Sequence, residues 1–187
     1  MRDKIIKSAQ ELFARYGYKK TTMDDIAGAS GKVKSAVYYY FKNKEEVLGA
    51  VANLEIEKGI EKLVKAVNSE KSAEGKIAAY IRARIYAKQS IASFYRFLPE
   101  EYFEQYEFIS KIRIELDKRE RAVISGILKK GIKEEAFGVK DVALTTRTIL
   151  NILKGLEHYY FKKRNNKKLQ EEIDSIIGVF LLGLLKR

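Results

Sequence analysis

The segment from Thr22 to Lys44, TMDDIAGASGKVKSAVYYYFKNK, constrains the fold of this chain more than any other. Thr22 followed three residues later by Asp25 is the pattern of a capping box, which starts a helix. Gly31 suits the turn that follows, and a second short helix then carries three consecutive tyrosines between lysines. Two short helices joined by a glycine turn predict a helix-turn-helix from Thr22 to Phe41. We interpret its second helix as one that contacts DNA.

The rest of the chain also favours helices. Residues 3–16 place apolar side chains at helical spacing, and Gly17 suits the end of that helix. Asn43 is expected to cap a further helix that begins KEEVLGAV. With one proline and 46% hydrophobic residues, an all-α fold is predicted. We expect a three-helix DNA-binding domain over residues 1–47 and a larger helical domain over residues 48–187.

Composition argues against several other classes of protein. The chain has no cysteine, one histidine and no glycine-rich phosphate loop, so we expect neither an enzyme nor a metal or cofactor site. The N-terminus lacks the apolar core of a signal peptide, and no run of 18 apolar residues is present to span a membrane. We therefore expect a cytoplasmic protein without a membrane partner.

The net charge of +12 suggests a polyanionic partner. Residues 26–44 contain four lysines and no acidic residue. Carboxylates near a phosphate-binding lysine would cancel part of the gain from counterion release, so an acid-free stretch suits a surface that faces DNA. A solvated lysine-rich surface would give the same count, and charge alone leaves both interpretations open.

About a quarter of the chain, from Ile5 to Leu48, resembles the TetR-type transcriptional regulators. The resemblance rests on ordered positions at matching spacing: Ala9, Leu12-Phe13, Gly17-Tyr18, Thr21-Thr22, Ile26-Ala27, Gly31, Tyr38, Tyr40-Phe41 and Lys44-Glu45. It implies an N-terminal DNA-binding domain, followed by a variable helical domain that dimerises and holds an effector. The expected partners are a double-stranded DNA operator, a second copy of the chain and a small apolar ligand.

The sequence departs from that family directly after the turn glycine. The family most often has Val-Ser there, with the serine capping the recognition helix, whereas this chain has Lys32 and Val33. Either Ser35 caps a later start or the helix end is left to water. Loss of a cap typically costs ~1 kcal/mol, which a helix held by tertiary packing can tolerate.

The N-terminal residues of the second helix are the candidates for reading bases. Lys34 can donate to guanine acceptors, Ser35 can pair with either kind of base edge, and Ala36 can pack on a thymine methyl. Tyr39 lies on the same expected face. We expect the remaining residues of this helix to pack in the core: Val37, Tyr40 and Phe41.

A second set of residues is expected to contact phosphates, which position the helix without reading sequence. Tyr38 and Tyr39 can donate hydroxyls, and Lys32 adds a cation beside the expected path of the backbone. Thr22 can offer donors at the start of its helix. Lys44, at the start of the fourth helix, is expected to act in the same way.

The C-terminal segment IDSIIGVFLLGLLKR is apolar nearly all round, so it must be buried on both sides. One face comprises Ile173, Ile176, Ile177, Phe180, Leu181 and Leu184. The second comprises Val179, Leu182 and Leu185. A similar stripe lies upstream: Val142, Ile149, Ile152, Leu153, Leu156, Tyr159 and Tyr160. The family resemblance implies a four-helix dimer interface built from these two helices; a monomeric core is the alternative.

Residues 77–137 are rich in aromatic side chains, which suits a pocket for an apolar effector. The candidates for its lining, with the single histidine, are Tyr86, Phe94, Tyr95, Phe97, Tyr102, Phe103, Tyr106 and His158. Ordinary core packing explains aromatic residues at helical spacing equally well, and His158 suits a structural role. A DNA-binding regulator or activator that needs no small molecule is therefore the alternative function.

Overall fold

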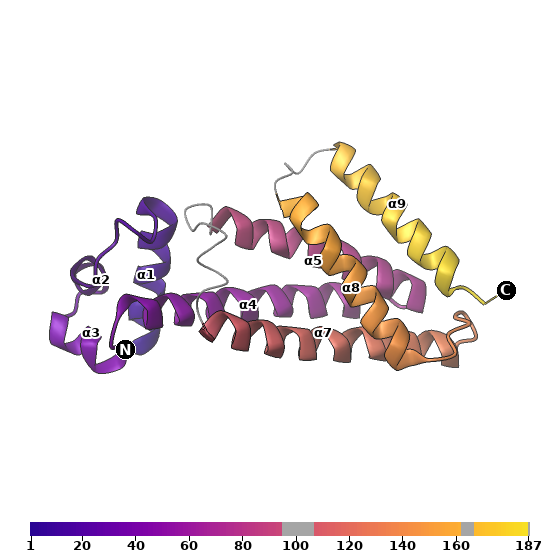
Figure 1. Ribbon diagram of the computed structural model, residues 1–187, viewed down its shortest axis with the longest axis horizontal. Helices are drawn as coiled ribbons and strands as arrows, with labels where there is room; N and C mark the ends of the chain where they lie inside the picture. Colours follow the sequence, from indigo (N-terminus) through magenta and orange to yellow (C-terminus); the bar gives the residue numbers. More distant parts are fainter. Residues whose placement is uncertain (95–106, 162–166, 187) are drawn as a thin grey trace. The chain divides into compact units, whose positions relative to one another are not determined.

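The computed structural model describes residues 1–94, 107–161 and 167–186, and Figure 1 shows these parts as helices joined by turns. The helices of the described chain are α1 (Arg2–Tyr16), α2 (Met23–Ser30), α3 (Lys34–Tyr40), α4 (Lys44–Ser69), α5 (Ala73–Phe94), α7 (Glu107–Lys133), α8 (Val142–Phe161) and α9 (Lys167–Leu184). The predicted all-α fold class is confirmed. Within the described ranges, no helix has both the length and the apolar character needed to cross a membrane.

The first and fourth helices have the ends that the sequence predicts. Gly17 follows α1 with φ +83°, a conformation that favours glycine, and its N–H donates to Phe13 O at 3.0 Å. Asn43 precedes α4, and its Oδ1 accepts from the backbone N–H of Glu46 at 2.8 Å. Both predicted helix ends are confirmed. Each depends on a hydrogen bond between residues only three or four positions apart, so the sequence alone could predict it.

The chain divides into two compact units, each with its own core. One unit comprises residues 1–58 and 93–114, and the other comprises residues 59–92 and 115–187. The core of the first unit includes Ile5, Ala9, Phe13, Ile26, Val37, Phe41, Val47 and Val51. The domain boundary expected after residue 47 stays a prediction, because α4 runs unbroken from Lys44 to Ser69.

In the second unit, the end of α4 packs with α5, α7, α8 and α9 around one hydrophobic core (Figure 1). Its largest buried side chains include Ile77, Tyr80, Ile81, Ile124, Leu128, Leu153, Leu169 and Ile173. The segment after α7 pairs with the end of α9, since Gly138 N–H donates to Leu184 O at 2.9 Å and Lys186 N–H donates to Ala136 O at 3.0 Å. This pairing fixes the C-terminal end of α9 to the α7–α8 connection.

Candidate nucleic-acid interface

Helix α2 starts at the capping box that the sequence predicts. The Thr22 hydroxyl oxygen accepts from Asp25 N–H at 3.1 Å, and Asp25 Oδ2 accepts from Thr22 N–H at 2.8 Å and from the Thr22 hydroxyl at 2.7 Å. These hydrogen bonds lower the pKa of Asp25 from its ordinary value. Both donors of Thr22 therefore go to Asp25 in this conformation. The predicted contact between Thr22 and a phosphate stays a prediction.

The turn between α2 and α3 depends on Gly31, whose φ of +63° and ψ of +38° lie in the left-handed region. Gly31 N–H donates to Gly28 O at 3.0 Å, and Lys32 N–H donates to Ala27 O at 2.9 Å. These bonds satisfy the last carbonyls of α2, as a glycine C-terminal cap does. The turn therefore sets where α3 begins.

Helix α3 begins at Lys34 without a side-chain cap. Val33 occupies the cap position and its side chain makes no capping hydrogen bond, while Ala36 N–H donates to Val33 O at 3.0 Å. Ser35 lies inside the helix and is exposed. Of the two possibilities left by the Lys32-Val33 departure, a later start at Ser35 is wrong.

The two faces of α3 differ sharply in exposure. Val37 and Phe41 are buried at 0% and 2% exposure, which confirms their predicted place in the core. Tyr40 is only half-buried and is not part of the buried core predicted for it; its ring centroid lies 5.0 Å from that of Tyr39 in an edge-to-face arrangement. Tyr39 itself is 82% exposed. The other candidate contacts of this helix are exposed or half-buried: Lys34, Ser35, Ala36 and Tyr38. Helix α3 thus presents these candidate side chains together while Val37 anchors it.

An acidic residue lies against this set of candidates. Lys34 Nζ is 2.8 Å from Asp24 Oδ1 and 3.0 Å from Asp24 Oδ2, and it lies 6.0 Å from the centre of the Tyr38 ring. The hydrogen bond and charge of Asp24 raise the pKa of Lys34. Sequence reasoning missed this contact, because the acid-free stretch begins just after Asp25 and the turn brings Asp24 back to the start of α3.

Lys44 holds the connection between α1 and α2. Its Nζ donates to Tyr18 O and to Thr21 O, each at 2.9 Å, and lies 4.3 Å from the centre of the Tyr18 ring. Burial lowers the pKa of Lys44, and the neighbouring charge of Glu45 opposes that effect. The ammonium is therefore engaged inside the protein. Its predicted contact with a phosphate stays a prediction, as does that of the half-buried Lys32.

Most of the predicted effector pocket lies outside the described part of the chain. Tyr86 on α5 is half-buried and packs against the core of the second unit. The other candidates lie outside the described residues or side chains: Phe94, Tyr95, Phe97, Tyr102, Phe103, Tyr106 and His158. The predicted pocket stays a prediction.

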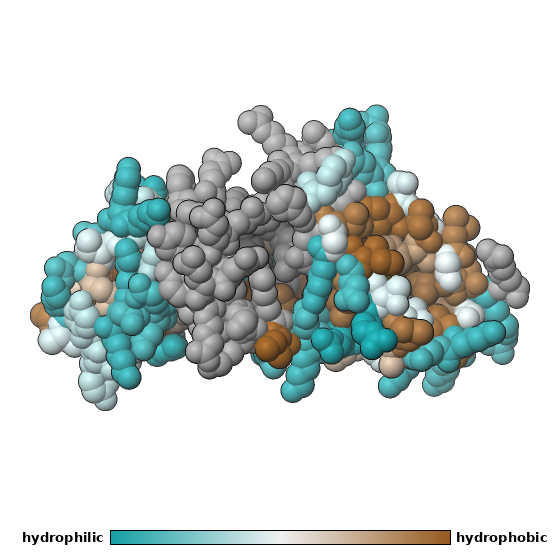
Figure 2. Space-filling view, viewed as in Figure 1, coloured by the Kyte–Doolittle hydropathy of each residue, from teal (hydrophilic) through white to brown (hydrophobic). Residues whose placement is uncertain are grey.

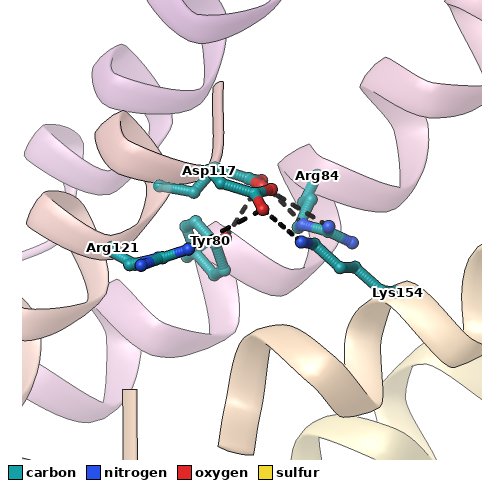
Figure 3. A network of polar contacts seen from close by, with 6 residues as sticks. Tyr80, Arg84, Asp117, Arg121 and Lys154 are labelled. Atoms are coloured by element: carbon teal, nitrogen blue, oxygen red, sulfur yellow. Dashed lines mark hydrogen bonds and ion pairs between the residues drawn. The ribbon is translucent and has the colours of Figure 1, made fainter. Parts of the chain in front are cut away.

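A polar network inside the second unit was not predicted (Figure 3). Arg84 on α5 and Glu120 on α7 are both 2% exposed; Arg84 Nε lies 2.6 Å from Glu120 Oε1, and Nη2 lies 3.4 Å from Oε2. The Tyr80 hydroxyl donates to the same Oε1 at 3.1 Å, and burial raises its pKa well above the ordinary value. Nearby, Asp117 on α7 pairs with Lys154 on α8. These contacts link three helices through charges far apart in sequence.

Comparisons with known proteins cover both units. Residues 5–51 match the family model described as bacterial regulatory proteins, tetR family. The chain is 25% identical to the HTH-type transcriptional regulator QacR of Staphylococcus aureus, over 100% of this chain and 99% of the relative. It is 26% identical to IcaR of Staphylococcus epidermidis, a negative transcriptional regulator of the biofilm operon icaADBC, over 97% of this chain and 99% of the relative. A solved TetR/AcrR-family regulator from Thermobifida fusca has a TM-score of 0.74 and 27% identity, covering 97% of each chain.

Proposed function

We propose that this chain, which belongs to the TetR family of transcriptional regulators, is a dimeric repressor that binds a palindromic DNA operator and is released by a small, largely apolar effector. The family is non-enzymatic. The proposed site of action is the cytoplasm, where the operator DNA lies. The observation that carries the proposal is the exposed face of α3, with Tyr39 outermost and Val37 buried beneath it.

That face has the chemistry that reading a major groove requires. Lys34 can donate to guanine O6 and N7, Ser35 can pair with several base edges, and Ala36 can pack on a thymine methyl. The hydroxyls of Tyr38 and Tyr39 can reach phosphates on either side and so set the position of the helix. Each α3 has only seven residues, so one copy reads few base pairs and a dimer on a two-fold-related site is needed.

Exposed apolar residues on α8 and α9 supply a surface for that dimer. Figure 2 shows hydrophobic atoms gathered over these two helices. The exposed members, here called the α8–α9 face, are Leu144, Ile152, Tyr159, Val179 and Leu182, together with Leu185 directly after α9. The other apolar face of α9 packs in the core, where Ile173, Ile177 and Leu184 are buried. A self-complementary patch of this kind suits an isologous dimer, in which each copy uses the same residues.

The repressor assignment and the effector are supported by different observations. The relative from Staphylococcus epidermidis is named as a negative regulator, which favours repression over activation here. The effector rests on the aromatic composition of residues 77–137. Such a ligand can release DNA only if it binds the two arrangements of the DNA-reading heads with different affinities.

The test of DNA reading is footprinting and binding on the DNA that flanks the gene for this chain. Tyr39→Ala is expected to weaken operator binding while the helical content and melting temperature stay unchanged. Tyr16→Ala removes another exposed tyrosine, at the end of α1, and serves as the matched control. Equal footprints for wild type and Tyr39→Ala would remove Tyr39 from the interface.

The dimer and the effector need separate tests. Leu182→Glu places a charge in the α8–α9 face, where the side chain is 72% exposed, and is expected to give a monomer in sedimentation. Ile114→Glu, at an exposed position on α7, is the control that should remain dimeric. A thermal-shift screen against lipids and aromatic compounds should find stabilisers by mass action. A wholly negative screen would favour a regulator that needs no small molecule.

A further inference from the structure

Asp24 is an acidic residue at the edge of a surface otherwise suited to binding a polyanion. It is the second residue of α2, and its carboxylate holds the ammonium of Lys34, the first residue of α3, at 2.8 and 3.0 Å. Its neighbour Asp25 has a structural reason to be acidic, because it completes the capping box with Thr22. Asp24 makes its contact across the turn, with the lysine best placed to read a base.

The ion pair between Lys34 and Asp24 can open at low cost when Lys34 meets another acceptor. The side chains of Lys34 and Asp24 are 60% and 64% exposed, and an ion pair in such surroundings contributes little to stability. A DNA group with well-placed acceptors can therefore replace Asp24 as the hydrogen-bond partner of the Lys34 ammonium. While the pair is closed, the charge of Lys34 is largely neutralised for anything that approaches α3.

Specific and non-specific DNA differ in what they offer this lysine. Any duplex offers phosphates, and a lysine that binds one gains affinity by releasing a counterion. A guanine in the right register offers two acceptors, O6 and N7, at a fixed position in the major groove. A carboxylate beside the lysine removes much of the affinity gained from a phosphate contact, since it competes with the phosphate for the lysine and repels it.

We infer that Asp24 is a specificity-determining residue that holds Lys34 in an ion pair on non-operator DNA and releases it to a guanine in the operator. This inference rests on the proposed function, in which α3 reads DNA. Asp24 lowers the affinity for unrelated sequences more than the affinity for the operator, and so widens the ratio between them. Lys34 donates the hydrogen bond to Asp24, and this bond together with the charge of Asp24 raises the pKa of the ammonium.

Asp24→Asn tests the inference, because asparagine keeps the shape and removes the charge. Binding to the operator duplex and to an unrelated duplex of equal length is measured between 50 and 200 mM salt. For the variant, affinity for unrelated DNA should rise roughly threefold at 50 mM salt, with a salt slope steeper by about 0.9, the contribution of one phosphate. Operator affinity should change less, so the specificity ratio falls.

Two further variants separate the ion pair from a general change of charge. Glu61→Gln adds the same charge difference at an exposed position on α4, in the second unit, and should leave the slope unchanged. In a Lys34→Ala background, Asp24→Asn should have almost no effect on unrelated DNA, because its partner is gone.

Other outcomes overturn the inference. Equal tightening on both duplexes would make Asp24 a source of general repulsion. Weaker operator binding with unrelated DNA unaffected would make it a group that orients Lys34 for the complex. An unchanged ratio, with wild-type protein still preferring the operator, refutes the role of Asp24 alone. Wild-type protein with no sequence preference refutes the proposed function itself.

Discussion

The ion pair between Arg84 and Glu120 allows a quantitative test of the interior of the second unit. Both side chains are almost wholly buried and hydrogen-bonded to each other, so each helps to compensate the other's buried charge. Removing one partner of such a pair leaves an uncompensated buried charge and costs about 3–5 kcal/mol. Arg84→Met and Glu120→Leu are therefore each expected to destabilise the protein by about 3–5 kcal/mol.

The double variant should lose far less stability than the sum of the losses of the two single variants. Arg84→Met with Glu120→Leu removes both charges together and leaves the Tyr80 hydroxyl without its acceptor, Glu120 Oε1. An unsatisfied buried hydroxyl costs about 1–3 kcal/mol, so the double variant should lose about that much. Adding Tyr80→Phe should recover part of the loss.

Urea unfolding of the full chain, followed by helical circular dichroism, measures these differences as shifts of the midpoint. Protein concentration is held fixed, because dimerisation would make the apparent stability depend on it. A double variant that loses the sum of the two single losses would refute coupling between Arg84 and Glu120. Singles that each cost less than about 1 kcal/mol would show that water solvates the pair, contrary to its burial.

Three further predictions concern single positions. Lys44→Met removes two charge-assisted hydrogen bonds and should cost about 2 kcal/mol in urea unfolding. If stability is unchanged and the salt slope of DNA binding falls by about one unit, Lys44 instead contacts a phosphate. The hydrogen bonds from Thr22 lower the pKa of Asp25 from its ordinary value, so Asp25 should stabilise the fold at a pH above that ordinary value and lose the effect as pH falls through its folded pKa. NMR titration should show that Thr22→Ala moves this pKa back toward its ordinary value. Gly131→Ala places a Cβ 2.1 Å from the Phe137 ring and should cost about 1–3 kcal/mol. Gly126→Ala should be neutral or stabilising in the same urea assay, because its Cβ meets no described atom within 4 Å beyond its chain neighbours and the nearby backbone of its own helix.

The sequence predicted the features that act over short distances along the chain. The capping box of Thr22 and Asp25, the turn at Gly31 and the cap at Asn43 each join residues at most five positions apart. Fixed helical spacing also predicted that Val37 is buried. Such patterns are legible because backbone geometry alone decides which neighbours meet.

The sequence predicted the start of α3 only in part. The sequence identified the missing cap after Gly31 and left two possible starts for the helix. The hydrogen bond from Ala36 N–H to Val33 O decides between them, because it places the first turn two residues earlier than a cap at Ser35 allows. Packing of Val37 and Phe41 in the core holds this uncapped end in place.

The sequence by itself determined that this chain is helical, where its helix-turn-helix lies and which family it resembles. Only the tertiary structure decided the partners of its charges. Lys34 meets Asp24 ten residues away, Lys44 meets carbonyls 23 and 26 residues away, and Arg84 meets Glu120 across 36 residues. No spacing rule relates such residues, since their contact depends on how whole helices pack. The pairing of charges is therefore a property of the folded chain, and the specificity inferred for Asp24 follows from it.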